Sequence, residues 1–126
     1  MSEDTSAPPA ANAAAIEQLT DTLYELLRAR ALSIGLMDIE VEAAGWLVEG
    51  ELLFTSGPDF GFSLDLRTGT CRYCELVEEV GERWCEPPLT GLQLATSPDE
   101  AQLHELSLAV LNGVLDARRP LLRAPQ

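Results

Sequence analysis

The chain has 126 residues and no lysine, and it sets 8 arginines against 21 aspartates and glutamates, for a formal net charge of −13. A protein this acidic is repelled by nucleic acid and by anionic membrane surfaces, and it attracts basic protein partners. The length suits a single domain, and a hydrophobic content of 46% argues against disorder of the whole chain.

The first predicted element is a helix over residues 13–33, which follows a disordered tail at residues 1–12. Its apolar residues recur at three- and four-residue steps, and this spacing places them on one face of the helix. Asn12 is the expected N-cap, and Gly35 is well placed to end the helix.

The next part of the chain alternates between apolar and polar residues, which predicts β-strands. The four expected strands are at residues 37–43, 46–55, 60–66 and 70–77. We expect the SGPD turn at residues 56–59 and the Thr68-Gly69 pair to join neighbouring strands as hairpins.

Residues 78–96 give the weakest pattern in the chain. The EEVGERW segment is typical of a turn or a short helix, and Pro87-Pro88 argues against regular strand pairing at that point. Residues 89–95 are therefore the candidate for a fifth strand at the edge of the sheet.

The last predicted element is a helix that begins with Ser97, Pro98 and Glu100, which match a capping box with proline in the first turn. It is expected to run to about Arg118 and to end at Pro120. Its apolar residues cover more than half of its circumference. Either the sheet and the first helix both cover it, or part of it forms a homodimer contact.

These elements predict one α+β domain over residues 13–120, with short tails at residues 1–12 and 121–126. The expected order is an N-terminal helix, an antiparallel sheet of four or five strands and a C-terminal helix, with both helices packed on one sheet face. The opposite face should then carry the polar side chains of the alternating strands.

Acidic residues are concentrated in the predicted strands. Twelve aspartates and glutamates lie between residues 38 and 86, against three arginines. Like charges on one sheet face reduce stability, so we expect such a row either where solvent covers it or where a basic partner docks. Trp84 adds an aromatic side chain of the kind that anchors interfaces. The candidate partner-binding residues are therefore Asp38, Glu40, Glu42, Glu49, Glu51 and Trp84.

The cysteines suggest a metal site as an alternative. Cys71 and Cys74 form a C-x-x-C pair, and Cys85 together with His104 would complete a Cys3His zinc set. If residues 70–77 form a strand, however, positions 71 and 74 point to opposite faces and cannot share one ion. We therefore expect no metal or other cofactor, and we interpret the cysteines as small apolar side chains.

No catalytic motif is present in the sequence. The absence of lysine excludes a P-loop and a kinase site, and no G-x-S-x-G turn is found. The N-terminus has no signal-peptide pattern, no apolar run approaches the roughly 18 residues that span a bilayer, and the odd cysteine count suits a reducing compartment. We therefore expect a non-enzymatic cytoplasmic protein.

The function that best suits this chemistry is binding and masking of a basic protein surface, as in a bacterial toxin-neutralising immunity protein. The alternatives are an acidic, dimeric secretion chaperone for an effector, a DNA mimic, and the small zinc-binding module. Class I type III secretion chaperones are similar to this chain in size, charge and α/β composition. Their helix between the third and fourth strands is not indicated here, because Thr68-Gly69 predicts a tight hairpin.

Overall fold

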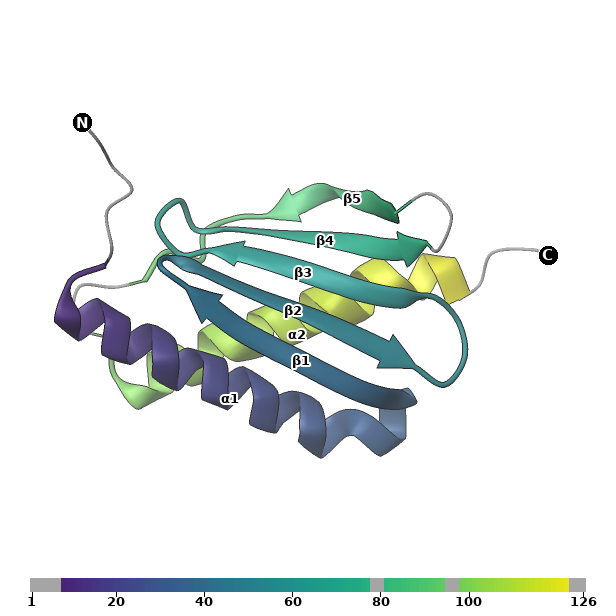
Figure 1. Ribbon diagram of the computed structural model, residues 1–126, viewed down its shortest axis with the longest axis horizontal. Coiled ribbons are helices and arrows are strands. Elements are labelled where there is room, and N and C mark those ends of the chain that lie inside the picture. Colours follow the sequence, from purple (N-terminus) through teal and green to yellow (C-terminus); the bar gives the residue numbers. More distant parts are fainter. Residues whose placement is uncertain (1–7, 78–80, 95–97, 123–126) are drawn as a thin grey trace.

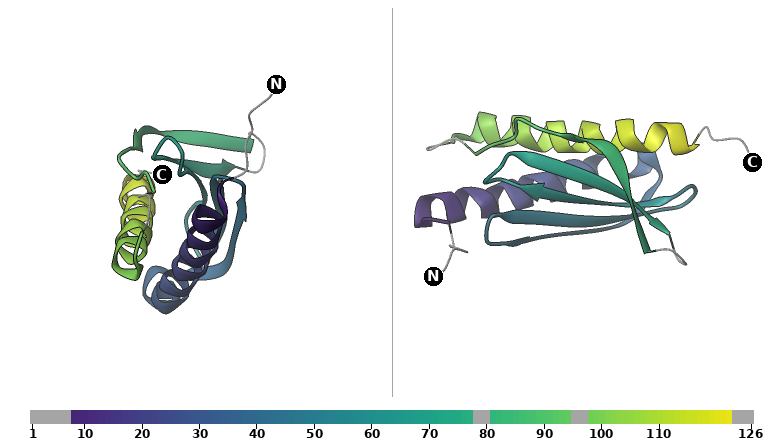
Figure 2. Two further views of the ribbon diagram at one scale, coloured as in Figure 1. Left: turned by 90° about the vertical axis from the view of Figure 1, so that its left-hand side faces the viewer. Right: turned by 90° about the horizontal axis from the view of Figure 1, so that it is seen from above.

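The computed structural model describes residues 8–77, 81–94 and 98–122, which form a two-layer α+β fold (Figure 1). One layer is a five-stranded antiparallel sheet in the order β1-β2-β3-β4-β5, and both helices lie side by side on one of its faces (Figure 2). The predicted fold class is therefore confirmed. In chain order the elements are α1 (Ala10–Ile34), β1 (Leu36–Ala44), β2 (Leu47–Phe54), β3 (Asp59–Asp65), β4 (Thr70–Val77), β5 (Gly81–Leu89) and α2 (Glu100–Leu122).

Helix α1 packs against the sheet through one apolar stripe. The buried side chains of this stripe are Ala15, Ile16, Leu19, Leu23 and Leu27. The predicted N-cap is wrong, because the helix begins at Ala10 and Asn12 lies inside its first turn. Pro9 takes the cap position with a φ of −56°, and the alanines that follow it favour helix. Gly35 ends the helix as predicted, in the left-handed conformation with a φ of 72°.

Helix α2 begins later and ends later than predicted. Its capping box is formed by Asp99 and Gln102: the Asp99 carboxylate accepts the Gln102 backbone N–H (2.9 Å), and the Gln102 side-chain oxygen accepts the Asp99 N–H (3.0 Å). Ser97, the predicted cap, lies outside the described residues. The helix continues to Leu122, past Pro120, where it was expected to end. A proline inside a helix removes one hydrogen bond and crowds the carbonyl four residues earlier, but here only two helical residues follow it.

The apolar circumference of α2 is covered within the chain on two sides. The helix packs against α1 and against β3 and β4. Its buried apolar residues Leu103, Val110, Leu111 and Val114 belong to the same core as the sheet and α1. Of the two explanations that the sequence left open, cover by the sheet and the first helix accounts for these residues. A homodimer contact through α2 stays a prediction.

The four strands predicted before residue 78 are found within one residue of their predicted ends. The fifth strand differs, because β5 covers part of the EEVGERW segment, where a turn or short helix was expected. Of the edge strand predicted at residues 89–95, only Leu89 lies in β5, residues 90–94 form no strand, and residue 95 lies outside the described residues. Residues 78–80 of that segment lie outside the described residues. Pro87-Pro88 is tolerated because β5 is an edge strand and its register against β4 shifts beside these prolines.

The two faces of the sheet carry different side chains because strand residues alternate between them. Val48, Leu52 and Leu64 are fully buried in the core with the helices. The opposite surface, which we call the outer face, is the one that neither described helix covers (Figure 2). Gly50 belongs to the inner face, where the ring of Phe62 occupies the space that a Cβ at position 50 would need.

Candidate partner-binding groove on the outer face

The strand register brings residues from five strands into two rows across the outer face. The first row consists of Glu40, Glu51, Gly61, Cys74 and Trp84, each paired with the next across the sheet. The second row consists of Glu42, Glu49, Ser63 and Arg72, paired in the same way. Each row begins with two glutamates on β1 and β2 and passes over a small residue on β3.

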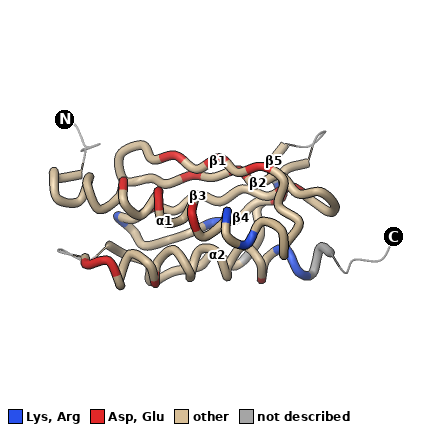
Figure 3. The backbone as a smooth tube through the Cα atoms, turned by 90° about the horizontal axis from the view of Figure 1, so that it is seen from below, with Lys and Arg blue, Asp and Glu red and all other residues tan. Residues whose placement is uncertain are grey.

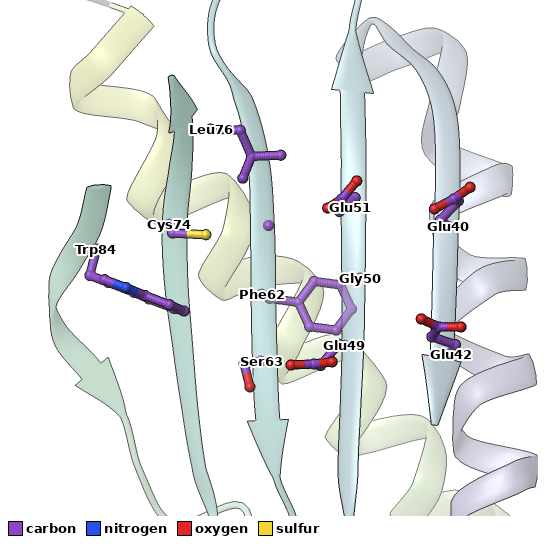
Figure 4. A pocket seen from close by; sticks show the side chains of 11 residues that line it. Glu40, Glu42, Glu49, Gly50, Glu51, Phe62, Ser63, Cys74, Leu76 and Trp84 are labelled. Carbon is purple, nitrogen blue, oxygen red and sulfur yellow. The ribbon is translucent and has the colours of Figure 1, made fainter. Parts of the chain in front are cut away.

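These rows line a shallow depression of about 190 Å³, which we call the groove (Figure 4). One wall is acidic and the opposite wall is formed by the β4 and β5 side chains. The floor lies low because Gly61 has no side chain and Ser63 has a small one. The ring of Phe62, which lies beside Gly50 on the inner face, closes the floor from below. The lining residues are Glu40, Glu42, Glu49, Gly50, Glu51, Gly61, Phe62, Ser63, Cys74, Leu76 and Trp84.

The acidic wall of the groove consists of four exposed glutamates, at positions 40, 42, 49 and 51. Other carboxylates are used locally: Asp59 accepts the backbone N–H of Phe54 (2.9 Å), and Glu75 forms an ion pair with Arg83 (3.5 Å). The ion pairs recorded among the described residues do not involve the four groove glutamates. Acidic residues also occur on both helices (Figure 3). The four on the outer face line one depression together.

The opposite wall of the groove is apolar and aromatic. Trp84 keeps 41% of its surface exposed, whereas Trp46 packs against the core. The guanidinium of Arg72 lies 5.4 Å from the centre of the Trp84 ring, in a cation–π contact. Cys74 is buried and Leu76 half-buried beside it. An incoming side chain therefore meets a hydrophobic surface at one end and negative charge at the other.

Asp38, the remaining predicted site residue, lies beside the groove rather than in it. Its carboxylate accepts the backbone N–H of Ile39 (2.9 Å), and it lines a neighbouring shallow depression together with Glu40 and Glu51. The pairing of β1 with β2 shifts register at this point, and Met37 is consequently exposed instead of pointing inward. The structure thus brings the other predicted residues, four glutamates and Trp84, into one depression.

The alternative zinc ligands are not brought together. Cys71 is buried on the inner face and Cys74 lies on the outer face, as the strand spacing predicts. His104 is exposed on α2, beside α1. Burial raises the pKa of the Cys71 thiol to about 11, which keeps it protonated at neutral pH and makes it a poor ligand. Within residues 8–77, 81–94 and 98–122 no group of three or more such side chains could hold a metal ion.

Comparison with known proteins adds no assignment to this geometry. Neither protein-family models, nor curated proteins, nor solved structures match the chain. No helix in the described part of the chain is long and apolar enough to cross a membrane. The function must therefore be inferred from the groove itself.

The groove glutamates should reduce the stability of the free protein. Glu40 lies directly opposite Glu51, and Glu42 lies directly opposite Glu49. Like charges in directly opposed positions destabilise a sheet. We expect the groove variant E40Q/E49Q/E51Q to be more stable to urea than the wild type by about 1 kcal/mol at low salt.

The matched control neutralises three exposed glutamates on the helices, at positions 17, 25 and 105. This helix variant, E17Q/E25Q/E105Q, changes the net charge by the same amount and should alter the unfolding free energy by less than about 0.5 kcal/mol. Molar salt should remove most of the advantage of the groove variant, because it screens exposed charges. Equal stability of the two variants at low salt would show that the paired glutamates do not repel one another appreciably.

Proposed function

We propose that this protein is a small cytoplasmic binding module that masks a basic surface of a partner protein, and that it acts as a toxin-neutralising immunity protein. One observation carries the proposal: four exposed glutamates share a depression with an exposed tryptophan, on the sheet face that the helices leave uncovered. Charge of one sign in a concave surface attracts a cationic partner and raises its association rate. The tryptophan supplies the apolar contact that retains the partner.

The cost of the acidic wall supports the same proposal. Glutamates in opposed positions lower the stability of the sheet. Glutamine or threonine at these positions would keep the face polar without the repulsion. The groove is built on paired strands and not on a loop, and such a preformed surface suits a folded target. This is the property that a protein needs when it must neutralise an active, folded toxin.

The second candidate function, a dimeric secretion chaperone, has less support. The β3–β4 connection is a tight hairpin that closes at Gly69 (φ 76°), with the carboxylate of Asp65 accepting the backbone N–H of Arg67 (2.9 Å). Helix α2, the expected dimer element, has its buried residues covered by α1 and the sheet. No catalytic activity is proposed.

The experiment is capture of the partner from the native host with three immobilised proteins: the wild type, the groove variant and the helix variant. We expect a basic protein to be retained by the wild type and the helix variant, to be lost with the groove variant, and to elute with salt. Retention by all three proteins, or capture of an acidic partner, would overturn the proposal. Inhibition of an enzymatic activity of the captured protein by a monomer supports immunity, and capture of an unfolded segment by a dimer supports the chaperone.

A further inference from the structure

The groove is too small for most classes of ligand. Its volume of about 190 Å³ is below the roughly 300–1,000 Å³ that small-molecule sites occupy. The groove therefore suits a single side chain that projects from the surface of a partner, and this inference rests on the proposed function.

The shape of the groove selects a long side chain with two chemically different parts. Leu76 and Cys74 on β4 are two strands away from Glu49 and Glu51 on β2, a separation of about 10 Å at the usual strand spacing. Trp84 lies one strand further out. A side chain that enters over β4 and β5 would lay an apolar stem on this wall and place its charged end among the glutamates.

We propose that the groove binds an arginine side chain of the partner, with its guanidinium among the four groove glutamates and its stem against Leu76 and Trp84. Arginine fits better than lysine because its planar guanidinium has five N–H donors. It can therefore donate hydrogen bonds to carboxylates on both neighbouring strands at once. Arginine also loses less hydration when it leaves water. The chain itself already provides one example of an arginine at this wall, the contact of Arg72 with Trp84.

The experiment titrates the ¹⁵N-labelled protein with N-acetyl-arginine amide, N-acetyl-lysine amide and N-acetyl-citrulline amide. Citrulline keeps the shape of arginine and removes its charge. The signals to follow are the indole N–H of Trp84 and the backbone N–H groups of Gly50 and Gly61, which line the groove. We expect saturable shifts with the arginine probe at a dissociation constant on the order of 1 mM, several-fold weaker binding of the lysine probe, and none of the citrulline probe.

Variants locate the binding site. The E49Q/E51Q protein should lose the arginine response, and W84L should weaken it about tenfold while keeping a folded spectrum. The helix variant should respond like the wild type. The R72Q protein should bind the arginine probe at least as tightly, because the substitution removes a positive charge that lies beside Trp84 and repels the probe. A response that W84L and E49Q/E51Q leave unchanged would overturn the assignment of the site.

Two further results would also overturn the arginine assignment: no saturable shift up to about 50 mM probe, or equal affinity for the arginine and lysine probes. The proposed function fails separately, when the captured partner binds the groove variant as tightly as the wild type. If the partner requires the groove glutamates while the arginine probe does not bind, the masking function stands and the arginine anchor is wrong.

Discussion

Replacing Gly113 of α2 with alanine is expected to destabilise the fold by about 1–3 kcal/mol, although alanine is normally about 1 kcal/mol better than glycine inside a helix. The reason is the side chain of Tyr73 on β4. A Cβ at position 113 would come well within 3.0 Å of the Tyr73 hydroxyl and ring, a separation that real side chains do not adopt. Tyr73 is buried and its hydroxyl donates to the carbonyl of Val110 (3.3 Å), so the ring has little room to move.

The neighbouring position provides the control for this substitution. Asn112 is exposed on α2. The N112A substitution should raise the unfolding free energy by about 0.5 kcal/mol, through helix propensity alone. Removing the Tyr73 hydroxyl with Y73F should relieve part of the G113A cost, so the two substitutions should not be additive in urea unfolding. A G113A protein that is as stable as N112A would show that α2 does not pack on β4 as described.

Substitution of Arg118 is the second change with a large expected effect. This arginine is only 5% exposed. Its guanidinium lies 3.5 Å from the centre of the Phe54 ring and donates to the carbonyls of Ser56 (2.6 Å) and Pro58 (2.9 Å). We expect R118A to cost about 2–4 kcal/mol of unfolding free energy, because it leaves two carbonyls without a donor and opens a cavity beside Phe54.

Arg119 is the matched control, since it is the next residue and carries the same charge. It is exposed and pairs with Asp116 within one turn of the helix (3.0 Å), so R119A should cost less than about 0.5 kcal/mol. R118K should fall between the two, because one ammonium cannot reproduce the planar contact with the ring and both hydrogen bonds. Equal midpoints for R118A and R119A in urea would refute the role of Arg118 in fastening the β2–β3 turn to α2.

The first four strands could be predicted from sequence because their alternation is regular and the turns between them contain glycines. Glu40 and Glu42 are two residues apart in one strand, so the alternation also predicts that they share a face of the sheet. The β1–β2 hairpin places Glu49 and Glu51 on the same face. The position of Trp84 opposite them could not be predicted. It depends on the register of β5 against Cys74, and Pro87-Pro88 argued against a strand at that place.

The role of Arg118 was missed for a different reason. In sequence it is one of several arginines near the C-terminal end of a helix, where a cation usually faces solvent. Its two acceptors lie about 60 residues earlier, in the β2–β3 turn, and no local pattern connects them to it. The low floor of the groove at Gly61 and Ser63 likewise could not be predicted, because it depends on the pairing of these residues with Glu51 and Glu49.

The most direct test of the acidic docking surface is the affinity of the captured partner for the groove variant and for the helix variant, measured in one buffer by titration calorimetry. Both variants remove three negative charges, so any difference between them reports position and not net charge. We expect the groove variant to bind at least about tenfold more weakly than the wild type and the helix variant to stay within about twofold. If both variants bind equally well, the sheet face is not where the partner docks.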